Sequence, residues 1–482
     1  MNPQIRRLGL VLLVLFLALF LRLNDLQVLR SERLATAPGN TRTVVRDFSR
    51  ERGTIQAADG AIVARSVPVD DDFERLREYP EGELFAHISG YFSFTYGTEG
   101  VERTYGSDLA GRSVAMKRPS DLFSDRVRTG NVTLTVSKSL QQVARDALGN
   151  RKGAVVALNP TDGGVLAMWS FPSFDPTPLA GHDQKAVQAR YAELQADQAK
   201  PLLPRSYRER YPPGSTFKVV TAAAALEQAP DLVSKDYPRL RTLDLPQTDR
   251  DLPNFENSTC GGALSDLLRV SCNTGFAQMG LDMGAEKLSG EAGDFGFGER
   301  PPLDLPATRA SVFPEAASFA RDSPALAKSA IGQQDVSSTP LQMALVAAGV
   351  ANGGVIMKPH VMAEVRDDEG EVVKTWNPEP WKQAMSPENA GVLRDMMIQV
   401  VNSGTGRRAA VPGVQVAGKT GTAQTADDNA HAWMVAFAPA EAPRVAIAVI
   451  VESQPGLGDS VTGGRVAAPI VQTVLRAALG AP

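Results

Sequence analysis

Residues 211–218 read Tyr-Pro-Pro-Gly-Ser-Thr-Phe-Lys and contain the only Ser-x-x-Lys pattern of the chain. Pro-Pro-Gly ends the preceding segment and an apolar stretch with helical spacing follows, which predicts Ser215 at the N-terminus of a helix. Its hydroxyl and the Lys218 amine then share one helix face, about 5–6 Å apart at Cβ. The helix dipole and burial both disfavour a charged amine there, so Lys218 is a candidate base for a serine nucleophile. Taken alone, the pattern also fits a helix N-cap followed by an ordinary surface lysine.

Two further motifs follow in the sequence. Ser271-Cys272-Asn273 falls between two predicted helices, and Lys419-Thr420-Gly421-Thr422 falls on a predicted strand. An isolated Ser-x-Asn is weak, because it also fits a turn in which Asn caps a helix. Ser-x-x-Lys, Ser-x-Asn and Lys-Thr-Gly in this order, however, resemble the three active-site motifs of penicillin-binding proteins and serine β-lactamases.

Residues 413–420 offer a competing interpretation, because they match the phosphate-loop pattern G-x-x-x-x-G-K-[ST]. That pattern requires a strand before the loop and a helix after the lysine. Here Val414 and Val416 alternate like a strand between the two glycines, and no helix start follows Thr420. We therefore expect a strand over residues 414–424 and no nucleotide site.

The composition disfavours several other classes of protein. Lysine and arginine number 50 against 54 acidic residues, a net charge of -4 without a long basic run, so no nucleic-acid partner is expected. The four histidines and two cysteines fit no usual zinc-ligand spacing. We expect neither a metal nor a cofactor.

The N-terminus carries a membrane signal. Residues 8–21 form an unbroken apolar run after Arg6 and Arg7, shorter than the ~20 residues that span a bilayer. A helix that continues through Arg22 to Val28 is long enough, with Arg22 snorkelling to the outer interface. The alternative is a cleaved signal peptide, but no small-x-small site follows the run. We expect an uncleaved single-pass anchor in the cell membrane, with a cytoplasmic N-terminus and an extracytoplasmic remainder.

Three segments are predicted along the chain. Residues 1–30 form the cytoplasmic tip and transmembrane anchor, residues 31–150 a polar module without catalytic chemistry, and residues 151–482 a large domain. Periodicity and turn residues place strands and helices in the last two segments. The strands are expected at 52–55, 59–64, 132–136, 154–158, 165–169, 414–424, 432–438 and 445–451, and the helices at 139–148, 219–226, 264–270, 274–281, 341–350 and 466–479. Strands at both ends of the large domain predict an α+β fold with one sheet closed by its two termini.

Over almost all of its length the chain resembles a class B penicillin-binding protein, most closely the actinobacterial penicillin-binding protein A group. Besides the three motifs, short stretches carry the resemblance: Arg52-Gly53-x-Ile55, Asp59-Gly60, Gly90-Tyr91, Gly100-Val101-Glu102, Gly153-Ala154-Val155-Val156 and Gly332-Gln333. It implies a penicillin-binding transpeptidase domain, similar to serine β-lactamases, with an antiparallel sheet flanked by helices. Residues 31–150 would form a non-catalytic pedestal, a dimerisation-like module that contacts partners.

The resemblance also implies a role for each motif residue of the acylation step. Ser215 would be the acylated nucleophile and Lys218 its general base. Ser271 would pass a proton towards the leaving D-alanine, and Asn273 would hold Lys218 or the amide of the substrate.

The Lys-Thr-Gly-Thr motif would bind the substrate. Lys419 would supply positive potential, and Thr420 and Thr422 would bind the substrate carboxylate. Backbone N–H groups of Ser215 and Thr422 would form the oxyanion hole. A side chain in place of Gly421 would obstruct the substrate strand laid against this edge.

The implied reaction is D,D-transpeptidation of peptidoglycan stem peptides, delivered on a lipid-linked precursor and blocked by β-lactam antibiotics. The resemblance suggests a SEDS-type glycosyltransferase as a partner, together with divisome or elongation proteins. Three alternatives share the motifs: a β-lactamase, disfavoured by the lack of Glu-x-x-Leu-Asn, a D,D-carboxypeptidase, and a non-turnover β-lactam sensor or scaffold. The acceptor amine and the choice between septal and elongation roles stay open.

Cys260 and Cys272 are the only cysteines, and Cys272 is the middle residue of the Ser-x-Asn motif. Two unpaired buried thiols are one possibility, but the oxidising side of the membrane favours a disulfide. Closing this loop would stabilise the fold by about 2–3 kcal/mol. Because Ser271 and Asn273 adjoin one end, the bridge is also expected to hold their loop in position.

Overall fold

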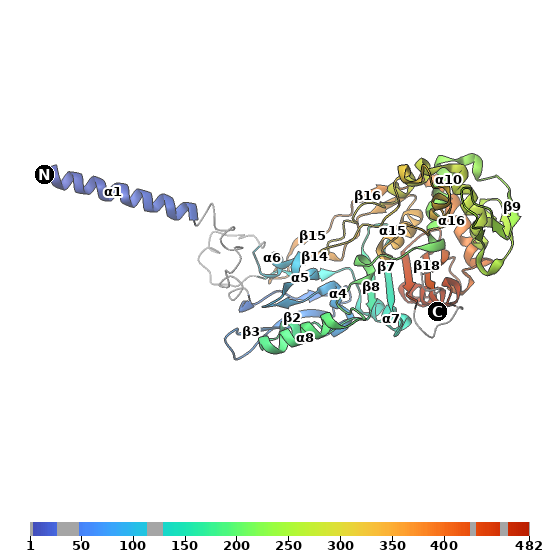
Figure 1. Ribbon diagram of the computed structural model, residues 1–482. Helices are drawn as coiled ribbons and strands as arrows, with labels where there is room; N and C mark the ends of the chain where they lie inside the picture. The colour runs from blue at the N-terminus through green and yellow to red at the C-terminus, as the bar shows by residue number, and fades with distance from the viewer. Residues whose placement is uncertain (1–2, 27–47, 113–128, 425–429, 454–460, 482) are drawn as a thin grey trace. The chain divides into compact units, whose positions relative to one another are not determined.

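The computed structural model describes residues 3–26, 48–112, 129–424, 430–453 and 461–481 (Figure 1). One unit comprises Met1–Glu51 with Val67–Leu76, and a second comprises Arg52–Ser66 with Arg77–Pro482. In the first unit, helix α1 (Pro3–Asn24) is long and apolar enough to cross a membrane, and none of its 22 residues is buried. The helix includes Arg22, as expected for an anchor, whereas Val28 lies outside the described residues.

The large domain is built on a five-stranded antiparallel sheet in the order β17-β18-β19-β7-β8. Its strands are β7 (Gly153–Leu158), β8 (Val165–Phe171), β17 (Ala417–Gln424), β18 (Ala430–Ala438) and β19 (Val445–Val451). β19 pairs with β7, so strands from both ends of the domain meet within one sheet, which confirms the predicted closure. Every residue of β19 is buried, so both faces of the sheet are covered.

Helices pack on this sheet and around one buried helix. α15 (Pro340–Ala351) contacts β7, β18 and β19, whereas α17 (Ala468–Leu479) contacts β18, β19 and α7 (Lys138–Leu148). α10 (Lys218–Gln228) is buried from Lys218 to Leu226. Its alanines at 222–225 keep it thin, so α11 (Leu264–Val270), α12 (Asn273–Met283), α13 (Ala285–Asp294) and α16 (Pro387–Asn402) all contact it. Packing on several sides fixes where the N-terminus of α10 lies.

The N-terminal module contains a six-stranded sheet in the order β15-β14-β6-β1-β2-β3. Its strands are β1 (Ile55–Gln56), β2 (Ile62–Pro68), β3 (Arg75–Glu78), β6 (Asn131–Leu134), β14 (Met362–Arg366) and β15 (Val372–Thr375). The first two strands form the expected hairpin. The sequence did not predict β14 and β15, which come from residues 151–482 and cover the edge of β6, with Val365 opposite Val132.

The expected strand over residues 414–424 is three residues shorter at its start. Val414 lies in a turn, bridged to Val411, and the strand begins at Ala417. The alternation of Val414 and Val416 therefore does not mark the strand, although a strand does follow from Ala417. β17 continues through Lys419 and Thr420 to Gln424, so these residues do not form the loop-to-helix junction of a phosphate loop.

The remaining elements are mostly short. The helices are α4 (Ala86–Ser89), α5 (Gly100–Thr104), α6 (Gly106–Leu109), α8 (Gln184–Ala196), α9 (Arg205–Arg208) and α14 (Ser323–Ser329). The strands are β4 (Phe92–Ser93), β5 (Gly97–Thr98), β9 (Tyr237–Leu240), β10 (Thr242–Leu243), β11 (Leu252–Pro253), β12 (Cys260–Gly262), β13 (Val355–Met357) and β16 (Pro380–Gln383).

Candidate active site

The three motifs meet at one cavity of about 890 Å³ between the helices and the β17 edge of the sheet. Ser215 lies in the 3-10 turn Gly214–Phe217 that leads into α10, Ser271 and Asn273 lie at the junction of α11 and α12, and the third motif lies on β17. The predicted residues that line the cavity are Ser215, Ser271, Asn273, Thr420, Gly421 and Thr422. The two predicted lysines are fully buried behind this wall.

The turn that carries Ser215 is pressed against β17. Gly214 has φ +52°, and a Cβ atom there would lie 2.8 Å from the carbonyl oxygen of Thr422. A Cβ on Gly421 would lie 2.9 Å from Cγ2 of Thr216 and 3.1 Å from the carbonyl oxygen of Pro213. The absence of a side chain at Gly421 thus lets β17 approach the serine turn. This contact is a reason for glycine that the sequence did not suggest, and clearance for a substrate strand stays a prediction.

The Lys218 amine is held by two short hydrogen bonds to neutral acceptors. Its Nζ donates to the Ser271 carbonyl oxygen at 2.8 Å and to Oδ1 of Asn273 at 2.7 Å, with Oγ of Ser271 farther away at 3.4 Å. Burial, and then the neighbouring Lys419, hold the pKa of Lys218 well below its ordinary range. A neutral amine has two N–H bonds, so these two acceptors occupy both and leave its lone pair free to take a proton.

The Lys419 amine also contacts the Ser271 hydroxyl. Its Nζ donates to Oγ of Ser271 at 2.7 Å and to the carbonyl oxygen of Thr420 at 2.8 Å. Burial lowers the pKa of Lys419 to about 7. Ser271 itself has a left-handed backbone, φ 60° and ψ 43°, a conformation that costs a non-glycine residue of order 1 kcal/mol. Both lysine amines therefore lie within hydrogen-bond distance of the Ser271 hydroxyl.

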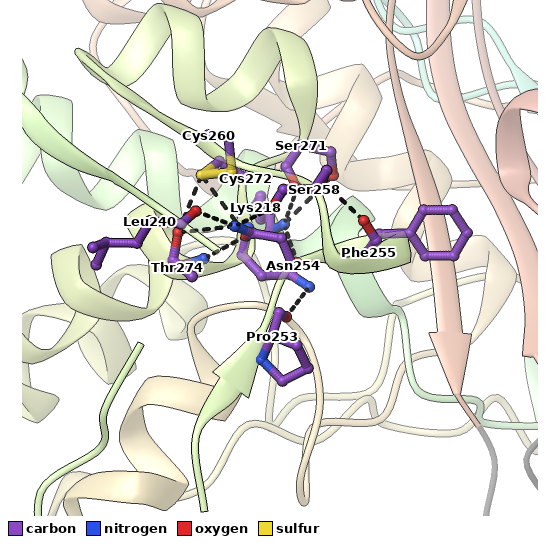
Figure 2. Close-up of a disulfide and its surroundings, with 11 residues drawn as sticks. Lys218, Leu240, Pro253, Asn254, Phe255, Ser258, Cys260, Ser271, Cys272 and Thr274 are labelled. Atoms are coloured by element: carbon purple, nitrogen blue, oxygen red, sulfur yellow. Dashed lines mark hydrogen bonds between the residues drawn. A yellow bond between two sulfur atoms is a disulfide. The ribbon is translucent and has the colours of Figure 1, made fainter. Parts of the chain in front are cut away.

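Cys260 and Cys272 form a disulfide next to this cluster (Figure 2). The bridge connects β12 to the residue between Ser271 and Asn273. The residues before β12 belong to the same wall, because Phe255, Glu256 and Asn257 also line the cavity.

The sequence motifs did not reveal two polar residues of the cavity wall. Oγ1 of Thr405 lies 2.6 Å from Oγ1 of Thr420, and the side chain of Asn254 contacts the start of α12. Their only sequence signals are the small-residue stretch 403–406 directly after α16 and a lone Asn after a proline. A basic edge of the cavity was also missed, formed by Arg407, Arg408 and Arg465.

The family described as Penicillin binding protein transpeptidase domain matches residues 153–476, and Penicillin binding protein A dimerisation domain matches residues 52–132. This chain belongs to the class B penicillin-binding proteins. It is 39% identical to the peptidoglycan D,D-transpeptidase PbpA of Mycolicibacterium smegmatis and 38% identical to that of Mycobacterium tuberculosis H37Rv, over 99% of each chain.

Solved structures of other penicillin-binding proteins have the same fold. The penicillin G acyl-enzyme complex of M. tuberculosis penicillin-binding protein A superposes with a TM-score of 0.82 at 38% identity, covering 89% of this chain and 100% of that one. Pseudomonas aeruginosa PBP2 superposes with a TM-score of 0.75 at 32% identity, covering 89% and 96%. Both the sequence family and the fold predicted from the three motifs are confirmed.

Proposed function

We propose that this enzyme is a peptidoglycan D,D-transpeptidase that acts through an acyl-enzyme on Ser215. The observation that carries the proposal is the buried Lys218 amine, whose two N–H bonds go to neutral acceptors beside the cavity that Ser215 lines. A deprotonated amine in this position is the base that a serine hydroxyl requires.

In the acylation step, Oγ of Ser215 attacks the penultimate D-Ala carbonyl of a stem peptide and its proton passes to Lys218. Backbone N–H groups of Ser215 and Thr422 stabilise the oxyanion, which is worth roughly 3–4 kcal/mol per donor. The C–N bond to the terminal D-Ala then breaks, and Ser271 donates the proton that the leaving nitrogen needs. Lys218, bonded to Asn273, lies within reach of Ser271 to restore that proton.

The substrate carboxylate is placed at the hydroxyls of Thr420 and Thr422. Thr405 supports this role, because its hydroxyl contacts that of Thr420. Lys419 adds positive potential from behind the wall, where it also orients the Ser271 hydroxyl.

An amine of a neighbouring stem peptide then attacks the Ser215 ester, forming the cross-link and regenerating the serine. A β-lactam enters the same first step: its ring amide opens on Ser215, but the leaving nitrogen stays tethered and blocks the acceptor. The M. tuberculosis relative is known as a penicillin G acyl-enzyme, and we expect this chain to form the same kind of adduct.

We place the enzyme in the cell membrane with α1 as a single-pass anchor, the N-terminus cytoplasmic and the catalytic domain extracytoplasmic. Arg6 and Arg7 before the apolar run support this orientation. A SEDS-type polymerase that supplies the glycan strand, within a septal or an elongation complex, is the proposed partner. The substrate would then arrive on a lipid-linked precursor.

Product analysis with the detergent-solubilised full chain tests this function. A D-Ala-D-Ala stem peptide should lose D-Ala and, when an amine acceptor is present, yield the cross-linked product. Fluorescent penicillin should label the wild type, whereas Ser215→Ala should stay dark. Hydrolysis alone would identify a carboxypeptidase, an adduct without turnover a sensor, and labelling of the Ser215→Ala variant would remove Ser215 from the mechanism.

A further inference from the structure

We infer that Asn254 is a positioning residue of this active site, which fixes the start of α12 and thereby turns the Asn273 amide towards Lys218. Asn254 belongs to none of the three motifs. The inference rests on the proposed function, in which Lys218 is the base for Ser215.

Asn254 caps α12 from a distant loop. It follows β11, lines the cavity and is 4% exposed. Its Oδ1 accepts the backbone N–H groups of Asn273 at 2.9 Å and of Thr274 at 3.0 Å, the first two residues of the helix. Cys272, the residue in the N-cap position, makes no side-chain cap bond. Asn254 therefore does the work of an N-cap side chain, which satisfies helix donors that would otherwise be buried without partners.

The other end of the Asn254 amide is anchored as well. Nδ2 donates to the carbonyl oxygens of Leu240 at 2.8 Å and Ser258 at 3.1 Å, and lies 3.3 Å from Oγ1 of Thr274 (Figure 2). The amide thus connects β9, its own loop and the helix start. Rotating it by 180° would place NH₂ against the N–H groups of α12 and oxygen against two carbonyls, so one orientation is strongly favoured.

The same loop decides which end of the Asn273 amide meets the lysine. Nδ2 of Asn273 donates to the carbonyl oxygen of Pro253 at 3.2 Å, which leaves Oδ1 facing Nζ of Lys218 at 2.7 Å. If Asn273 shifted or flipped, Lys218 would lose one of the two acceptors that hold its N–H bonds. The lone pair of the Lys218 amine would then no longer be held in a fixed direction, although the side chains of all three motifs would still be present.

The loop is held in a strained shape. Glu256 and Asn257 both have φ 52°, in the left-handed region that non-glycine residues avoid. Such strain persists where surrounding contacts determine the geometry. Here the contacts are those of Pro253 and Asn254 at one end of the loop and the Cys260 disulfide at the other.

The test is the second-order rate constant for acylation of the full-length protein by fluorescent penicillin, measured against pH for Asn254→Ala and Asn254→Asp. The Ala variant should slow acylation roughly 10–100-fold, as loss of a supporting contact does at other preorganised sites. The midpoint of its pH profile should move to lower pH, because the Lys218 ammonium loses an acceptor. The Asp variant keeps the acceptor for α12 but adds a negative charge, so its midpoint should move to higher pH.

Asn131→Ala is the matched control. Oδ1 of Asn131 likewise accepts two hydrogen bonds, from the backbone N–H and the hydroxyl of Thr54, but it lies in the N-terminal module. This variant should melt at a lower temperature while its acylation rate and pH midpoint stay those of the wild type.

A folded Asn254→Ala variant with the wild-type rate and midpoint would overturn the inference. If that variant does not fold, the Asp variant decides, and an unchanged midpoint there overturns it equally. Absence of penicillin labelling in the wild type would instead overturn the proposed function, and this inference with it.

Discussion

The N-terminal module and the active site both bury ionisable side chains, but they surround them differently. In the module, the fully buried Glu102 carboxylate accepts hydrogen bonds from Nε of Arg52 and Nε of Arg77, each at 2.6 Å. In the active site, Lys218 and Lys419 are equally buried, yet among the described residues their amines hydrogen-bond only to carbonyl, hydroxyl and amide oxygens. Nζ of Lys218 also lies over the Phe276 ring, 5.6 Å from its centre.

The difference separates a structural use of buried charge from a chemical one. Burial alone would raise the pKa of Glu102, but the Arg77 and Arg52 guanidiniums outweigh it and hold the pKa below its usual range. The carboxylate therefore stays ionised and fixes the module. No carboxylate of the described residues pairs with either lysine amine, so burial lowers the pKa of both. A general base at neutral pH requires the second arrangement.

Lys218→Arg should have the largest effect on the acylation rate. Arginine keeps its proton, so the variant carries a permanent cation in place of an amine that can be neutral. Acylation by penicillin should fall by roughly 10²–10⁴-fold, the contribution of a positioned base. Lys235→Arg is the control, since Lys235 forms a partly exposed ion pair with Asp282 and should leave the rate unchanged. Wild-type acylation by Lys218→Arg would exclude Lys218 as the base.

Glu102→Gln should destabilise the N-terminal module without changing the rate of acylation. It leaves two buried guanidiniums uncompensated, so the free energy of unfolding should fall by roughly 3–5 kcal/mol. Penicillin should acylate the folded protein at the wild-type rate. The exposed Arg65–Glu78 pair provides the control, because Glu78→Gln should cost ~0–1 kcal/mol in denaturant titrations. Equal stabilities of the two variants would refute a structural role for the buried cluster.

Glu291 is a buried carboxyl outside the active-site cavity, and burial raises its pKa. Only the side chain of Gln228 favours the ionised form of this carboxyl, and its influence is outweighed. Burial, followed by the charges of Asp294 and Glu227, raises its pKa from 4.5 to about 8. The folded state therefore holds a proton that the unfolded state releases, and stability from this group is lost as pH rises from 4.5 to 8.

Glu291→Gln removes that titration. Relative to the wild type, the variant should gain roughly 2–4 kcal/mol of unfolding free energy between pH 5 and pH 8. Denaturant titrations at both pH values measure the gain. A stability difference between variant and wild type that does not change with pH would show that Glu291 is ionised in the fold.

Removing the disulfide is expected to have only a modest effect on catalysis. Denatured, unreduced protein should show no free thiols on titration. Reduction should lower the free energy of unfolding by about 2–3 kcal/mol and should slow acylation, because Cys272 lies between Ser271 and Asn273. The slowing should be weaker than for Asn254→Ala, since Asn254 still caps α12. An unchanged acylation rate after reduction would separate the bridge from catalysis.

The sequence predicted the local elements and the motifs well for physical reasons. Apolar alternation in β19 and helical spacing in α10 follow directly from burial, and the three motifs carry the reactive groups themselves. Asn254, by contrast, acts through bonds to backbone groups of β9 and α12, which no local pattern encodes. The same holds for β14, whose place beside β6 depends on long-range pairing. The contact of Gly421 with Thr216 could not be predicted either, because only the folded structure brings the two residues together.

The pH dependence of wild-type acylation by penicillin tests most directly the claim that Lys218 acts as a neutral base. The rate constant should rise as Lys218 loses its proton and should level off well below 10.5, the ordinary pKa of a lysine. At pH values below the pKa of Lys218, the rate constant should fall about tenfold per pH unit. A rate constant that keeps rising until pH 10.5 would show that Lys218 titrates like an exposed lysine and would contradict its role as the neutral base.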